Sequence, residues 1–230
     1  MKKNLKIAVL LLSVFSMAFF NNSCSKNLYL SGNFRAYSQN HRTVAIVPPI
    51  IAYNSARVGI AGYASSEEIN RESLNLQNEL YNRLLIQTTA KKPVLINFQD
   101  IAVTNDLLKQ NGLTADNLRN VSIADLLKIL KADAILITRV DKEMIINEKA
   151  SELYKIGKAA AEIIGKKTVG NSAESMSMGK VKINSSLYNF QNSELLWKTW
   201  NEYNISVNQS TEIIFSKYTT GCSKGFPYRD

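Results

Sequence analysis

The sequence predicts an α/β fold: a mixed β-sheet with flanking helices and a C-terminal antiparallel hairpin. Three observations support this fold class. Apolar runs at 44–47 and 134–138 are typical of strands that are buried on both faces. Two segments with leucines at helical spacing each begin at a serine that can cap a helix. Near the C-terminus, two segments of alternating polarity flank the polar turn Gln191-Asn192-Ser193.

The N-terminus has the pattern of a secretory signal peptide, which we assign to residues 1–23. Three lysines in the first six residues precede an apolar run of 14 residues, 7–20. A membrane-spanning helix needs about 20 residues, so this run is too short to cross the bilayer. Ser23-Cys24 resembles the end of a bacterial lipobox, although Asn21 stands where that pattern prefers leucine. We therefore predict that Cys24 is the lipid anchor, carrying palmitate-type chains, with plain secretion as the alternative.

The residues after Cys24 indicate where the protein is anchored. In Gram-negative lipoproteins, an aspartate directly after the lipidated cysteine resembles a signal for retention in the inner membrane. This position is Ser25 here, so we expect the protein at the periplasmic face of the outer membrane. Residues 24–41 are polar with isolated aromatics and are predicted to be a short lipidated tether. The net charge falls from +9 to +6 without the three signal lysines. The remaining lysines are scattered, which favours a solvated surface or contact with anionic headgroups or cell-wall polymer, and not nucleic acid.

Residues 42–230 are predicted to form a single α/β domain. Pro48 and Pro49 end the first strand because neither has an N–H for the sheet. Ser65 and Glu68 form a capping box for the first helix, whose apolar side carries leucines at helical spacing (Ile69, Leu76, Leu80 and Leu84).

The middle of the domain continues this alternation of strands and helices. The segment "KKPVLINFQDIAV" predicts a second strand, and 105–110 a short helix closed by Gly112. Ser122 and Asp125 cap the next helix, which leads directly into the strand at 134–138. Helical spacing recurs over 148–165 (Leu153, Ile156, Ala160 and Ile163).

The C-terminal hairpin contains the two tryptophans. Trp197 belongs to the apolar side of the return strand, whereas Trp200 falls on the polar side. Either the helix at 148–165 covers Trp200, which we favour, or Trp200 is an exposed contact for a partner. A last helix is predicted near 209–218.

Several segments together resemble a superfamily of periplasmic lipoproteins. These segments are the lipidated cysteine, "VAIVPP", "LKADAILITRV" and "LYNFQNSELLWKTW", and the similarity covers about residues 43 to 208. The superfamily includes the curli-secretion lipoprotein CsgG and the penicillin-binding-protein activator lipoproteins. The resemblance implies a non-enzymatic protein and brings no catalytic residues with it.

The two best-understood branches of that superfamily fit this chain less well than a compact lipoprotein does. A secretion pore needs membrane-spanning strands, but 147–180 carries helical spacing with charges on its polar side. An activator of peptidoglycan synthesis needs a longer arm than residues 25–41 provide. We therefore expect a binding or assembly component of the envelope, with a regulator of peptidoglycan synthesis as the alternative and an enzyme with a hidden site as the less favoured one.

Residues for catalysis or metal binding are sparse. His41 is the only histidine, so neither a Ser-His-Asp triad nor a multi-histidine metal site is available, and we expect a solvated loop histidine. Cys222 has no catalytic partner in the sequence and is interpreted as a bystander thiol. The sequence predicts no catalytic residues, no metal, no cofactor and no small-molecule substrate. The expected partners are the membrane through Cys24, and envelope proteins or a second copy of the chain.

Overall fold

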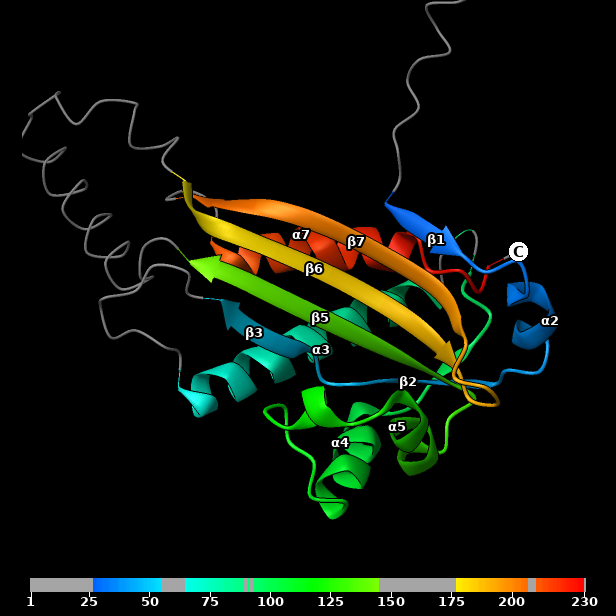
Figure 1. The fold of residues 1–230 in the computed structure, drawn as a ribbon. Coiled ribbons are helices and arrows are strands. Elements are labelled where there is room, and N and C mark those ends of the chain that lie inside the picture. The colour runs from blue at the N-terminus through cyan, green and yellow to red at the C-terminus, as the bar shows by residue number, and fades with distance from the viewer. Residues whose placement is uncertain are drawn as a thin grey trace, which may run out of the picture.

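The computed structural model describes residues 27–54, 65–88, 91, 93–144, 177–206 and 210–229, and these residues form a mixed seven-stranded sheet with helices against both faces (Figure 1). The predicted fold class is therefore confirmed. The strand order is β1-β7-β6-β5-β2-β4, and β3 also pairs with β5. In chain order the elements are β1 Leu28–Leu30, α2 Phe34–Ser38, β2 Thr43–Ile46, β3 Ile50–Asn54, α3 Ser66–Thr88, β4 Asn97–Phe98, α4 Ile101–Gln110, the 3-10 helix Leu118–Asn120, α5 Ile123–Leu130, β5 Ala134–Met144, β6 Ser177–Asn189, β7 Leu195–Ser206 and α7 Thr211–Lys224.

The long strand β5 divides the sheet into two halves. On one side β2 and β3 pair with it in parallel, and on the other side β6, β7 and β1 follow in antiparallel order. Helices separate the parallel strands along the chain, whereas a tight turn joins β6 to β7, as the hairpin prediction required.

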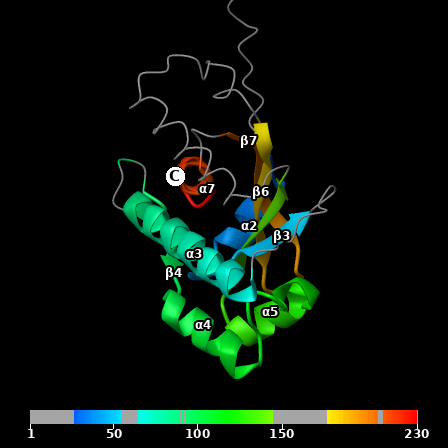
Figure 2. The same ribbon diagram turned by 90° about the vertical axis from the view of Figure 1, so that its left-hand side faces the viewer.

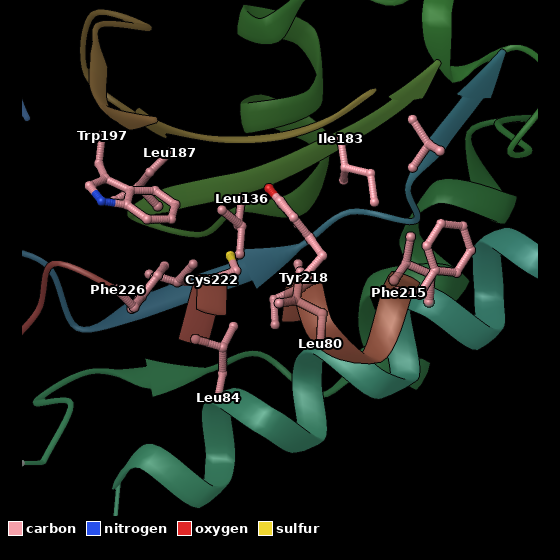
Figure 3. Close-up of a cluster of buried hydrophobic side chains, with 14 of the residues drawn as sticks. Leu80, Leu84, Leu136, Ile183, Leu187, Trp197, Phe215, Tyr218, Cys222 and Phe226 are labelled. Atoms are coloured by element: carbon pink, nitrogen blue, oxygen red, sulfur yellow. The ribbon is translucent and has the colours of Figure 1, made fainter. Parts of the chain in front are cut away.

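The two faces of the sheet are covered unequally (Figure 2). Helices α3 and α7 pack along one face and enclose the larger core, part of which is shown in Figure 3 (Leu80, Leu84, Leu136, Ile183, Leu187, Trp197, Phe215, Tyr218, Cys222 and Phe226). On the opposite face α4 and α5 enclose a smaller core over β2 and the first half of β5 (Ala45, Val47, Leu108, Leu126, Leu127, Leu130, Ile135 and Ile137). Burial of these side chains supplies the main driving force for folding.

Both predicted helix caps are present. The Ser65 hydroxyl accepts from the Glu68 N–H, and the Glu68 carboxylate accepts in return from the Ser65 N–H. The Ser122 hydroxyl accepts from the Asp125 N–H at 3.1 Å and donates to the Asp125 carboxylate at 2.6 Å. Gly112 follows α4 with φ +70°, a conformation that glycine adopts at little cost. These local signals are satisfied as predicted because they involve residues only a few positions apart.

Several element boundaries differ from the prediction. Pro48 and Pro49 end β2, but they do not end the pairing of this segment with β5. Parallel pairing with β5 resumes in β3, where Ile50 lies opposite Arg139. Helix α4 begins at Ile101, where Asp100 accepts from the Ala102 N–H, so most of the predicted second strand reduces to the two residues of β4. Helix α7 runs to Lys224, beyond the predicted end near 218.

The predicted tether over 24–41 is wrong for its central part. Residues 28–30 form β1, which pairs with β7, and residues 34–38 form α2. Phe34 is buried in the larger core, edge to face with Tyr228, and this apolar contact outweighs the polar composition of the segment. The Ser31 hydroxyl also donates to the Glu194 carboxylate in the hairpin turn. Regular structure is therefore present within the predicted tether, from Leu28.

Three hydroxyl groups connect the two layers inside the larger core. Thr138 on β5 and Ser185 on β6 are hydrogen bonded at 2.7 Å, and the Tyr218 hydroxyl of α7 donates to Ser185 at 2.8 Å. Figure 3 shows the Tyr218 ring directed from the helix toward the sheet. Because these buried polar atoms have partners, they carry little desolvation penalty.

Other predictions fall on residues outside those that the structure describes. These are the signal peptide 1–23, the anchor Cys24 and the helix over 148–165. Among the described residues, no helix combines the length and the apolar character that a membrane span requires.

Candidate functional site

His41 is not the solvated loop residue that the sequence predicted. Its Nδ1 lies 2.5 Å from the Tyr228 hydroxyl and its Nε2 lies 2.9 Å from the Asn189 side-chain oxygen. Because an amide oxygen only accepts, Nε2 donates to Asn189, and in the neutral imidazole Nδ1 accepts from the Tyr228 hydroxyl. The imidazole thus links the segment before β2 to the hairpin and to the C-terminus. Both ring nitrogens are hydrogen bonded within the fold.

The cavity beside His41 is small. It has a volume of about 60 Å³, and its lining comes from four segments (Tyr37, Asn40, His41, Asp133, Asn189, Phe190 and Gln191). Pockets for small organic ligands usually measure about 300–1,000 Å³, so this one holds only a few water molecules. The Asp133 carboxylate in it already accepts from the N–H groups of Arg42 and Thr43. The cavity does not fit a substrate site.

Cys222 and Lys142 are buried reactive groups with structural surroundings. Burial raises the pKa of the Cys222 thiol to about 12, so the thiol is protonated and unreactive at neutral pH, as its interpretation as a bystander predicted. Lys142 on β5 forms an ion pair with Glu72 of α3, and Tyr53 donates to the same carboxylate at 2.8 Å. Within the described part of the chain, no three residues of the metal-ligand types lie close enough together to hold an ion.

The most extended candidate surface is the part of the sheet that neither helix layer covers among the residues that the structure describes. In Figure 1 it faces the viewer across β5, β6 and β7, and in Figure 2 it is seen edge-on, opposite α3 and α7. We call it the open face. Residues paired between antiparallel strands share a face, so the register places its side chains in rows. One row is Arg139, Asn184 and Trp200, and the next is Asp141, Lys182 and Glu202.

Charges of both signs alternate over the open face. Glu202 lies 3.1 Å from the Lys180 ammonium and 3.6 Å from the Lys182 ammonium. These interactions lower the pKa of the Glu202 carboxyl, the hydrogen bond from Lys180 most of all. All three side chains are about half exposed, so water screens the ion pairs and they remain able to exchange partners.

Trp200 lies at the β7 end of the first row. Its side chain is 42% exposed, while Trp197 on the other face is 1% exposed, as the alternation predicted. The Lys198 ammonium lies 6.0 Å from the Trp200 ring centroid. The helix expected to cover Trp200 lies outside the described residues, so the preferred explanation from the sequence is not tested. The exposed contact for a partner, the alternative that the sequence left open, is likewise not tested.

The sequence did not single out the residues beside Trp200. Tyr29 of β1 pairs with Lys198 and is 45% exposed, and Leu28 and Leu30 are also exposed. Strand β1 is only three residues long, which is too short for alternation of apolar and polar residues to identify a strand. Its pairing partner β7 lies about 170 residues away in the sequence.

Comparison with known proteins finds similarity only among solved structures. No family model matches the sequence, and no curated protein matches it either. Lipoprotein GNA1162 from Neisseria meningitidis has a TM-score of 0.41 and 16% identity, covering 80% of this chain and 99% of that one. A PelC dodecamer from Paraburkholderia phytofirmans has a TM-score of 0.35 and 9% identity, covering 80% and 86%. The LpoB C-terminal domain from Salmonella enterica has a TM-score of 0.34 and 11% identity, covering 75% and 95%. We draw no functional conclusion from similarity at this level.

Proposed function

We propose that this protein is a non-enzymatic lipoprotein that binds or assembles envelope proteins at the periplasmic face of the outer membrane. In this proposal residues 1–23 are a signal peptide, Cys24 carries the lipid, and the chain from Asn27 onward is the binding domain. We also propose that the protein is related to the CsgG-like periplasmic lipoproteins. The observation that carries the proposal is the open face, with Trp200 exposed among charges of both signs.

The charge pattern of the open face favours a protein partner. A polyanion such as nucleic acid is bound by clustered cations, whereas carboxylates of Asp141 and Glu202 interrupt the cations here. Alternating charges instead select a partner whose own charges are complementary. Tryptophan contributes strongly to protein interfaces because its large ring buries much apolar surface. The partner we expect is another envelope protein or a second copy of this chain.

The lipid anchor has a direct test. Replacement of Cys24 by alanine (C24A) should leave the precursor unprocessed and remove the protein from the outer-membrane fraction, because the acylated thiol is the attachment point. Mass spectrometry of the purified protein should show acyl chains in the wild type only. Normal processing and fractionation of the variant would contradict the anchor.

The binding surface is tested by site-specific photocrosslinking in intact envelopes. A photoreactive amino acid at Lys182 lies on the open face, and the same residue at Lys109 lies on α4, at an exposed site on a different surface. We expect a discrete crosslinked product from position 182 and none from position 109. Trp200→Ala should weaken the product from position 182. Equal products from both positions, or none from 182, would refute the open face as the binding surface.

The mass of the product identifies the partner. A product of twice the mass of the chain that yields only its own peptides indicates a second copy, and foreign peptides indicate another envelope protein. Both results agree with an assembly role.

A further inference from the structure

We propose that the edge of the sheet formed by β1 and β7 is a membrane-contact surface, which rests against the phospholipid headgroups of the bilayer that holds Cys24. This inference rests on the lipid anchor proposed above. It concerns the side of the domain that faces the membrane, which an anchor by itself does not determine.

The first argument is the short distance between the anchor and the folded domain. The Asn27 carbonyl accepts from the Trp200 N–H and from the Thr199 hydroxyl, both at 3.1 Å, so Asn27 is held on β7. Only three peptide units join Cys24 to Asn27, and an extended chain spans at most about 3.5 Å per residue. The acylated sulfur therefore lies within roughly one headgroup layer of the β7 edge, because the chain reaches about 10 Å at most. A domain tethered this closely cannot stand away from the bilayer.

The second argument is the composition of this edge. The exposed fractions of Leu28, Tyr29, Leu30 and Trp200 are 40%, 45%, 52% and 42%. They are four of the ten large hydrophobic side chains exposed in the described part of the chain, and they lie along one edge of the sheet next to Asn27. Tyr29 and Trp200 lie on the open face of this edge, and Leu28 and Leu30 on the helix-covered face. Tyr and Trp are enriched at the level of lipid headgroups, since their rings are apolar while their O–H and N–H groups can hydrogen bond. The edge thus has the residue types of a membrane interface.

Cations flank this edge on both faces of the sheet. Lys198 lies beside Trp200 on the open face, and the Lys217 ammonium of α7 lies 5.8 Å from the ring of Tyr203 on the helix-covered face. Cations near an anionic leaflet are attracted to its phosphate groups. Contact with phosphate groups therefore adds to the apolar contact of the β1 side chains.

The backbone of β1 limits the depth of this contact. In an antiparallel pair, alternate residues direct their N–H and C=O groups toward the partner strand, and the register directs those of Leu28 and Leu30 away from β7. Such groups cannot enter hydrocarbon without a large desolvation cost, whereas headgroups and interfacial water can hydrogen bond to them. The edge accordingly lies at headgroup depth and does not insert.

This placement also orients the rest of the molecule. In Figure 1, β1 and the part of β7 beside it lie at the top of the sheet, and α4 and α5 lie at the bottom of the fold. With the β1–β7 edge on the membrane, the sheet stands on that edge. The open face is then directed along the membrane surface, where a neighbouring membrane-attached protein can reach it.

Single introduced cysteines can test the contact, because the acylated Cys24 has no free thiol and Cys222 is buried with a raised pKa. Leu30→Cys on β1 and Val103→Cys on α4 replace exposed apolar residues at opposite ends of the fold. Each variant, in the full lipidated chain, is labelled with an environment-sensitive fluorophore and reconstituted into phosphatidylethanolamine–phosphatidylglycerol vesicles that contain nitroxide-headgroup lipid. We expect a blue shift and at least threefold stronger nitroxide quenching at position 30 than at position 103. Equal quenching at the two positions would overturn the inference.

The controls separate this inference from the lipid anchor itself. Purified protein whose mass lacks acyl chains on Cys24 would refute the anchor and the inference together. Acylated protein bound to vesicles without quenching at position 30 would refute the inference alone. A third outcome is protein that sediments as a dimer, with a label at position 30 that shows blue-shifted emission but no nitroxide quenching. This result would show that a second copy covers the edge, and it would also overturn the membrane contact. A second label at Leu28→Cys should reproduce the result from position 30.

Discussion

Removal of the carboxylate that pairs with Lys142 should destabilise the fold strongly. The Lys142 side chain is 1% exposed, and its ammonium contacts the Glu72 carboxylate and the Tyr53 hydroxyl, the latter at 3.2 Å. Glu72→Gln keeps the shape of the side chain but removes the negative charge. The ammonium would then be buried without a counter-ion, which is the costly situation for a charged group in a protein interior.

The size of the effect follows from the surroundings of the pair. Loss of one partner of a buried ion pair costs about 3–5 kcal/mol. Two features place this case at the lower end: the Glu72 side chain is 21% exposed, and the ammonium keeps its contacts with the rings of Tyr53 and Phe215, at 5.0 and 5.6 Å from their centroids. We expect a loss of about 3 kcal/mol. With a urea m-value of about 2 kcal/mol/M, the unfolding midpoint falls by roughly 1.5 M.

Urea unfolding followed by the fluorescence of the buried Trp197 measures this change. The double variant Glu72→Gln with Lys142→Met should recover most of the stability, because it buries no unpaired charge. Lys180→Met is the matched control, since it removes a lysine from an exposed ion pair with Glu202 and should leave the midpoint unchanged. A Glu72→Gln protein with the wild-type midpoint, or a double variant as unstable as the single one, would refute the reasoning.

Two further predictions concern the cap of α5 and the buried thiol. Ser122→Ala should cost about 1 kcal/mol of unfolding free energy, because it removes the bond to the Asp125 N–H. Ser210→Ala is the control and should cost less, because the Ser210 side chain makes no capping bond at its N-cap position. Equal losses of stability in urea unfolding would contradict the cap at Ser122. Burial raises the pKa of Cys222 to about 12, so as the pH rises the thiol loses its proton in the unfolded chain before it does so in the folded protein. The stability that this group contributes is therefore present below about pH 9 and is lost between about pH 9 and 12. Cys222→Ala should therefore reduce the pH dependence of unfolding above pH 9 by up to about 1.4 kcal/mol per pH unit, and an identical pH profile would show that the thiol is not buried in solution.

The sequence predicted those parts of the fold that depend on neighbouring residues. The caps at Ser65 and Ser122 and the hairpin turn all involve residues within a few positions of one another. Strand β3 was missed because two prolines usually end a strand, and only the neighbouring β5 shows that the same edge continues after Pro49. The start of α4 was missed because Ile101, Ala102 and Val103 continue an apolar run, and the cap at Asp100 was not distinguished from a strand end.

The candidate surface was predicted in part. Alternation along β7 correctly placed Trp200 opposite Trp197, because side chains in a strand point to alternate faces. Which helices cover which part of the sheet depends on packing between distant segments, so the extent of the open face could not be read from the sequence. The pairing of Lys142 with Glu72 joins residues 70 positions apart and had no local signal.

The pairing of β1 with β7 has a consequence for the order in which the fold forms. Residues 28–30 meet residues 197–199, so contact between them in an unfolded chain closes a loop of about 170 residues. Once β2 is paired with β5, and β5 with the hairpin, only the segment between β1 and β2 has to close. The entropic cost of closure then falls by about 2 kcal/mol. The central strands should therefore assemble first and β1 should dock last. As a three-residue strand on the outside of the sheet, β1 should also detach before the central strands, with amide hydrogens that exchange well before those of β5 and β6.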